Sequence, residues 1–179
     1  LSCKVLENGN YLIGVHIADV SYYVPKDSPL DKDAFRKGTS NYLAGKVIPM
    51  FPHELSNGIC SLNPYVERLA MSCIMEVNKD GEVVNYEILP TVIKSQLKMS
   101  YTKVNAILKE GKVDSEYEEH ANTLRTLSKL ALVLRRNRLK NGAVEFDRPE
   151  LKLILGEDGK VSDFSVRIQD VAENLIEEY

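Results

Sequence analysis

A short apolar stretch near the start of the chain, GVHIADVSYYV over residues 14–24, carries two side chains that could do chemistry. They are His16 and Asp19, placed within and at the end of a run that alternates like a strand. A carboxylate at a strand end can leave the core and face a cleft, close to a metal ion or to one of its ligands. Asp19 can equally cap the following turn by accepting backbone N–H groups, and the sequence leaves both interpretations open.

The histidines and cysteines offer weaker candidates for a reactive or metal-binding site. His16 points to the face opposite Asp19 if the strand is regular, and no second histidine or cysteine lies at ligand spacing from it. We therefore predict that His16 is a core histidine or supports a ligand, rather than being a ligand itself. The three cysteines form no CxxC pair, which favours reduced thiols and a cytoplasmic location over a disulfide framework or a zinc site.

Composition and charge restrict the class of protein. The chain has 179 residues, 44% hydrophobic and 27% charged, which is ordinary for a globular protein. No apolar run approaches the roughly 20 residues that cross a bilayer, so we expect no membrane partner. The net charge of −3 weighs mildly against a simple nucleic-acid-binding module, which usually shows a basic face. An enzyme that holds cations can nevertheless be acidic overall.

Antiparallel hairpins are the first kind of element that the sequence predicts. The dipeptide Asn8-Gly9 joins two strand-like runs, and Lys79-Asp80-Gly81 joins two more. Residues 150–167 read as a further hairpin. Residues 39–64, rich in proline, glycine and asparagine, are expected to be mostly loop, with one helical turn near Glu54.

Helices are expected between and after these hairpins. A short helix begins at an N-cap, Asp27 or Ser28, and ends at Gly38, and Ser100 can cap another over residues 101–111. The longest helix is predicted over residues 115–142, where Gly142 suits the C′ position that ends a helix, and a last helix is predicted from about Ile168. The long helix has an amphipathic stripe, whose positions recur at three- and four-residue spacing: His120, Leu124, Leu127, Ala131 and Leu134. Hairpins with interspersed helices make the predicted fold class α+β.

A series of motifs, in order and spacing, covers nearly the whole chain. They read HIADV, TSNYL, IPMFPHELSNGICSLNP, GAVEF and LIEEY. With them the chain resembles the catalytic (RNB) domain of the ribonuclease II / ribonuclease R family. The resemblance implies a hydrolytic, magnesium-dependent 3′→5′ exoribonuclease. Such an enzyme degrades single-stranded RNA processively to nucleoside 5′-monophosphates and carries flanking OB-fold domains.

The chain also departs from that family. The family's metal-binding aspartates, in a pattern like DxxxxxDxDDA, lie just before the segment where this chain starts, and the first acidic residue here is Glu7. The family's catalytic arginine falls beyond Tyr179. We therefore expect residues 1–179 to be an internal piece of an RNB domain that contains no metal ligands of its own and is inactive alone.

The resemblance also assigns roles to individual residues. Asp19 would lie near the metal site. Tyr42, in TSNYL, matches the tyrosine that stacks on the terminal nucleotide, and Phe146, in GAVEF, matches the aromatic that clamps the 3′-end bases from the other side. Glu177 matches a glutamate that hydrogen-bonds the terminal nucleotide. Glu178 is adjacent, and only one of the two can face a cleft because helix neighbours point about 100° apart.

Two questions stay open at this stage. The basic end of the long helix could contact RNA phosphates, although a solvated helix end is the favoured interpretation; its residues are Arg135, Arg136, Arg138 and Lys140. The chain could also be a non-catalytic RNA-binding homologue of the same fold. A small-molecule enzyme has little support, because the sequence contains no glycine-rich phosphate loop, GxSxG or HExxH motif.

Overall fold

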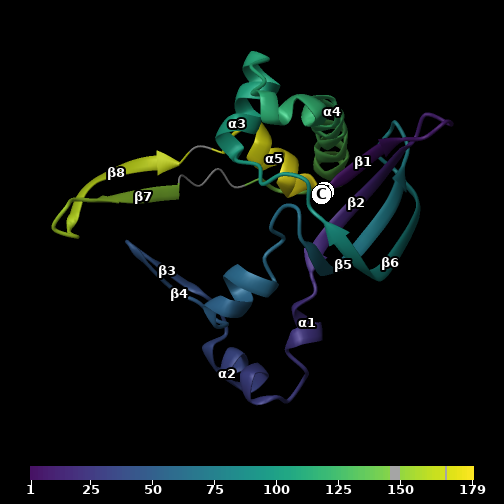
Figure 1. The fold of residues 1–179 in the computed structure, drawn as a ribbon. Coiled ribbons are helices and arrows are strands. Elements are labelled where there is room, and N and C mark those ends of the chain that lie inside the picture. Colours follow the sequence, from purple (N-terminus) through teal and green to yellow (C-terminus); the bar gives the residue numbers. More distant parts are fainter. Residues whose placement is uncertain (146–149, 168) are drawn as a thin grey trace.

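The largest sheet is built from the two hairpins predicted in the first half of the chain. The computed structural model describes residues 1–145, 150–167 and 169–179. The sheet's strands are β1 (Ser2–Val5), β2 (Tyr11–Ala18), β5 (Glu67–Val77) and β6 (Val83–Lys94). They form an antiparallel, four-stranded sheet in the order β1-β2-β5-β6 (Figure 1). Gly9 turns the first hairpin with a φ of +83°, a conformation that costs glycine little.

The turn of the second hairpin rests on the longest helix, α4 (Glu118–Lys140). Asn137 of α4 donates a hydrogen bond from Nδ2 to the backbone oxygen of Asp80, at 2.6 Å. A Cβ on Gly81 would come within 2.9 Å of that same Nδ2 atom. Glycine suits this turn because of its positive φ, and a larger residue would also have to displace the Asn137 amide.

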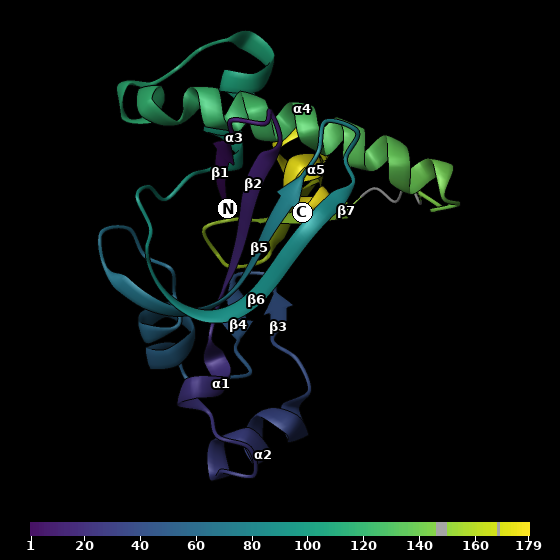
Figure 2. The same cartoon turned by 90° about the vertical axis from the view of Figure 1, so that its right-hand side faces the viewer.

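The main core lies between the sheet and α4, which runs across the upper ends of the strands in Figure 2. Ile13 and Val77 of the sheet pack against Leu127 and Leu130 of the helix. The predicted stripe is confirmed for its central members, since Leu124, Leu127 and Ala131 are buried. The last helix, α5 (Val171–Glu178), adds Leu175 to this cluster.

A second cluster joins the N-terminal half of α4 to the segment before it. This segment contains α3 (Tyr101–Asn105), the π-helical turn η2 (Ala106–Glu110) and the 3₁₀ turn η3 (Ser115–Tyr117). Tyr117 is buried against Ala121 and Ala172, and its hydroxyl accepts a hydrogen bond from the Ser100 backbone N–H at 3.2 Å. The predicted long helix therefore starts three residues late, because residues 115–117 form the tighter turn.

The predicted helix ends are confirmed by their hydrogen bonds. Ser28 caps α2 (Pro29–Lys37) by accepting from Asp31 N, and Ser100 caps α3 by accepting from Lys103 N. Gly142 has a φ of +91°, and its N–H and that of Ala143 bond the oxygens of Leu139 and Arg138. This pair of bonds is the Schellman arrangement that ends a helix at a C′ glycine.

The segment predicted as mostly loop contains a small hairpin that the sequence did not reveal. Strands β3 (Asn41–Leu43) and β4 (Lys46–Ile48) pair across a turn at Gly45, whose φ is +71°. Three-residue strands show too little alternation to be recognised from the sequence. The helical turn expected near Glu54 is present as η1 (Glu54–Ile59), and a one-turn helix, α1 (Val20–Tyr23), follows β2.

The predicted late hairpin is also present, as β7 (Glu150–Leu155) and β8 (Val161–Arg167), which form a separate two-stranded sheet among the described residues. The final helix begins at Val171, slightly after the expected start; Ile168 lies outside the described residues. The α+β fold class is confirmed. None of the helices in the described ranges is long and apolar enough to cross a membrane.

Candidate functional site

Asp19 is the N-cap of α1. Its Oδ1 accepts hydrogen bonds from the Ser21 hydroxyl at 2.6 Å and from the Tyr22 backbone N–H at 3.2 Å. Its own N–H donates to Leu69 O on the neighbouring strand. The capping interpretation of Asp19 is therefore realised in the structure. Its half-buried carboxylate has a second oxygen, Oδ2, so a cap and a place near a metal ion are compatible.

His16 belongs to a chain of hydroxyl contacts on the other face of the strand. Its Nδ1 lies 2.7 Å from Ser72 Oγ and its Nε2 3.1 Å from Ser2 Oγ, while Ser72 Oγ lies 2.5 Å from Thr91 Oγ1. Burial lowers the pKa of His16, because desolvation disfavours its charged form. The structure thus gives His16 a role in joining β1, β2 and β5.

Tyr42 lies on β3, in the hairpin that stands apart from the four-stranded sheet (Figure 1). Its backbone partner is Val47, and the side chain is 80% exposed. An aromatic ring at this exposure has a face free for stacking, and it contributes to neither buried cluster among the described residues. Phe146, the second predicted aromatic, lies outside the described residues.

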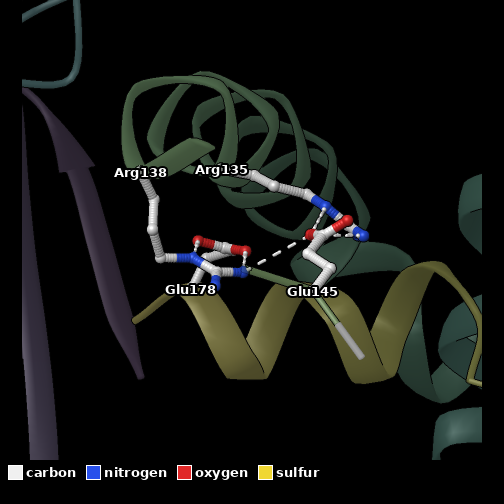
Figure 3. A network of polar contacts seen from close by, with 4 residues as sticks. All are labelled: Arg135, Arg138, Glu145 and Glu178. Carbon is white, nitrogen blue, oxygen red and sulfur yellow. Dashed lines mark hydrogen bonds and ion pairs between the residues drawn. The ribbon is translucent and has the colours of Figure 1, made fainter. Parts of the chain in front are cut away.

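Glu177 and Glu178 differ in what they contact, as Figure 3 shows for the second of them. Glu178 receives two hydrogen bonds from Arg138, Nη2 to Oε1 at 2.6 Å and Nε to Oε2 at 3.1 Å. Its side chain is only 3% exposed. Glu177 is exposed and takes part in no hydrogen bond or ion pair with the described residues. Glu177 is therefore the glutamate available to a ligand.

The basic end of α4 is partly neutralised by carboxylates. Arg135 Nε lies 2.8 Å from Glu145 Oε1, and Arg138 Nη2 lies 3.7 Å from the same oxygen (Figure 3). The hydrogen bond from Arg135 lowers the pKa of Glu145. Arg136 and Lys140 are exposed and form no ion pair within the described ranges. Two of the four basic residues considered for phosphate contacts are thus committed to carboxylates.

The structure places the three site residues that it describes on separate elements. Asp19, Tyr42 and Glu177 lie on three elements, the cap of α1, β3 and α5, and β3 and α5 are apart in both views (Figures 1 and 2). A hollow of about 640 Å³ lies elsewhere, between the start of the chain, residues 93–99 and helices α4 and α5. Its lining includes His16, His120 and Leu124 but not Asp19, Tyr42 or Glu177.

The described residues do not by themselves make a magnesium site. A magnesium ion needs several oxygen ligands in near-octahedral geometry. No group of three or more His, Cys, Asp or Glu side chains able to hold a metal occurs in residues 1–145, 150–167 and 169–179. Asp19 offers a single carboxylate that is already used as a cap.

The whole chain, residues 1–179, matches the model of the RNB domain. The chain belongs to the RNB domain family. This RNB chain is 48% identical to "Ribonuclease R" of Thermotoga maritima over 180 residues, and 44% identical to "Ribonuclease R 1" of Lactococcus lactis over 177 residues. These matches cover 100% and 98% of the chain but 25% and 22% of the relatives, so the chain spans about a quarter of their length.

A solved structure agrees with the RNB assignment. The chain superposes on "Mycoplasma genitalium RNase R in complex with ribose methylated single-stranded RNA" with a TM-score of 0.92 and 30% identity. The superposition covers 98% of the RNB chain and 27% of that protein. The resemblance to the ribonuclease R family and the α+β fold are thereby confirmed.

Sequence reasoning missed one part of the site region, the ion pairs of Glu145 and Glu178 with the arginines of α4. A weak signal was present: a helix end rich in arginine is followed within a few residues by a lone glutamate, Glu145. The pairing of Arg138 with Glu178, 40 positions apart, has no local signal at all.

Proposed function

We propose that this chain is the central part of the catalytic domain of a hydrolytic 3′→5′ exoribonuclease that degrades single-stranded RNA to nucleoside 5′-monophosphates. The observation that carries the proposal is the end-to-end match to a Ribonuclease R at 48% identity. A structural neighbour that binds single-stranded RNA with the same fold supports RNA as the partner.

In this proposal, the chain's own residues bind and orient the 3′ end of the RNA. The exposed ring of Tyr42 stacks on the terminal base, and stacking suits an enzyme without sequence preference because every base has a π-face. The exposed carboxylate of Glu177 accepts a hydrogen bond from the terminal nucleotide. Phe146 holds the last bases from the opposite side.

The metal belongs to a part of the protein outside these residues. We propose that aspartates preceding Leu1 in the longer protein hold magnesium and that Asp19 lies beside them. Its Oδ2 atom, which the cap of α1 does not use, would face the metal site. When bound, magnesium supplies an activated water and stabilises the leaving oxygen. The flanking OB-fold domains supply further RNA-binding surface, and the protein acts in the cytoplasm.

The test is magnesium-dependent release of nucleotides from a labelled single-stranded RNA. The full-length protein should release nucleoside 5′-monophosphates, whereas residues 1–179 alone should release none. Robust turnover by residues 1–179 alone would show that the chemistry has been placed in the wrong part of the protein. A full-length protein that binds the RNA but releases no nucleotide would instead be the non-catalytic RNA-binding homologue.

A further inference from the structure

The end of α4, the segment that follows it and the distant end of α5 meet at one network of ion pairs, which consists of Arg135, Arg138, Glu145 and Glu178 (Figure 3). The arginines come from the last turns of α4, Glu145 from the segment after that helix, and Glu178 from the end of α5. Arg138 is the link, because its Nη2 lies 2.6 Å from Glu178 and 3.7 Å from Glu145. We refer to these four residues as the arginine network.

The pair between Arg138 and Glu178 is geometrically specific. An arginine that donates two parallel bonds to one carboxylate fixes the angle between them as well as the distance. The Glu178 side chain is 3% exposed, so removing its partner would leave a buried carboxylate without compensation. The end of α5 is therefore held to α4 in one rotational setting.

That setting decides which glutamate faces outward. Ala172 and Leu175 are buried, and Glu178 continues the same side of α5 at three-residue spacing. Glu177 lies about 100° further round the helix and is exposed. A rotation of the last turn that freed Glu178 would turn Glu177 away from its present direction.

We propose that Arg138 is a positioning residue for RNA binding. Its two hydrogen bonds to Glu178 fix the last turn of α5 so that Glu177 points toward the 3′-terminal nucleotide. The inference rests on the proposed function, specifically on the contact between Glu177 and RNA. The Nε and Nη2 atoms of Arg138 are already bonded to Glu178, so in this proposal Arg138 acts through Glu178 and not through a contact of its own with RNA. Arg136, two residues before Arg138 and exposed, has no ion-pair partner in the described chain and serves as the matched comparison.

The experiment is a double-mutant cycle in the full-length protein, with the Kd for a fluorescein-labelled single-stranded oligoadenylate measured in EDTA to prevent turnover. Arg138→Gln should raise Kd about tenfold, the loss of one charge-assisted contact. In a Glu177→Gln background, Arg138→Gln should change Kd less than about twofold, because it acts through Glu177. Arg136→Gln, which removes the same charge from the same helix end, should change Kd less than about twofold in both backgrounds.

Other outcomes separate this inference from the proposed function. If Arg138→Gln weakens binding equally in the presence and absence of Glu177, the positioning role is wrong and Arg138 acts on the RNA or on folding. If Glu177→Gln leaves Kd unchanged, the inference is also wrong, although continued release of nucleotides would keep the proposed function. Arg138→Lys keeps the charge without the bidentate grip, and it replaces Arg138→Gln in the cycle if the latter fails to fold.

Discussion

At the scale of single residues, the exposed ring of Tyr42 carries the most direct prediction. In the full-length protein, Tyr42→Ala should lengthen the final undegraded RNA fragment more than it slows cleavage of long RNA, because one stacking contact of about 1–3 kcal/mol matters most when few nucleotides remain bound. Gel analysis of end products measures this. Tyr42→Phe should keep the original end product, and so should Tyr86→Ala, which removes an exposed tyrosine from β6. An unchanged fragment in Tyr42→Ala would count against stacking.

The lowered pKa of His16 should make the free energy of unfolding of the chain depend on pH. Because burial lowers its pKa in the folded chain below the ordinary value of 6.5, the unfolded chain binds the proton more readily. The contribution of His16 to stability is therefore complete above about pH 6.5 and is lost as the pH falls through the lowered pKa. Urea unfolding at pH 7.5 and 5.5 should show a smaller decrease in His16→Gln than in the parent.

His53→Gln is the control for that measurement. His53 lies in the proline-rich segment, where its Nδ1 lies 3.1 Å from Asn57 Nδ2, away from the sheet. The parent's pH dependence should survive this change. Loss of the dependence in His53→Gln, or its full retention in His16→Gln, would contradict the assignment.

At the scale of elements, α4 carries the core, and two of its leucines make a matched pair. Leu130 is 3% exposed and packs against the sheet, whereas Leu132 is 60% exposed on the same helix. Leu130→Ala should lower the free energy of unfolding by about 2–5 kcal/mol, because it removes buried methyl groups and leaves a cavity. Leu132→Ala should change it by less than about 0.5 kcal/mol. Denaturant titration followed by circular dichroism compares the two, and equal losses would mean that α4 is packed with another face inward.

At the scale of the whole molecule, α4 covers only part of one face of the sheet. Ile13 lies under the helix, but the side chains that continue the same face toward the other end are exposed; these are Ile17, Met71, Ile88 and Val92. An apolar patch of this kind is unusual on an isolated chain.

The 179-residue chain should therefore bind a hydrophobic dye. The double variant Ile88→Thr/Val92→Thr should reduce the dye fluorescence and leave the free energy of unfolding within about 0.5 kcal/mol, because threonine keeps strand propensity at exposed positions. Leu132→Ala removes apolar surface elsewhere and should leave the fluorescence unchanged. Equal fluorescence in the double variant and the parent would mean that this face is covered.

Much of the fold could be predicted because its signals are local. The turn at Asn8-Gly9, the caps at Ser28 and Ser100 and the C′ glycine Gly142 each depend on the chemistry of a few adjacent residues, and the structure confirms all four. The β3–β4 hairpin could not be predicted in this way, since strands of three residues carry little pattern.

The candidate site divides in the same manner. The sequence by itself determined the RNB family, the α+β class and which residues match the family's motifs, because motif order and local periodicity are written along the chain. Only the tertiary structure decided that Glu178 is bound by Arg138 while Glu177 stays exposed. The physical reason is that burial and ion pairing depend on which distant residues come into contact. Arg138 and Glu178 are 40 positions apart, and no local sequence pattern indicates that they pair.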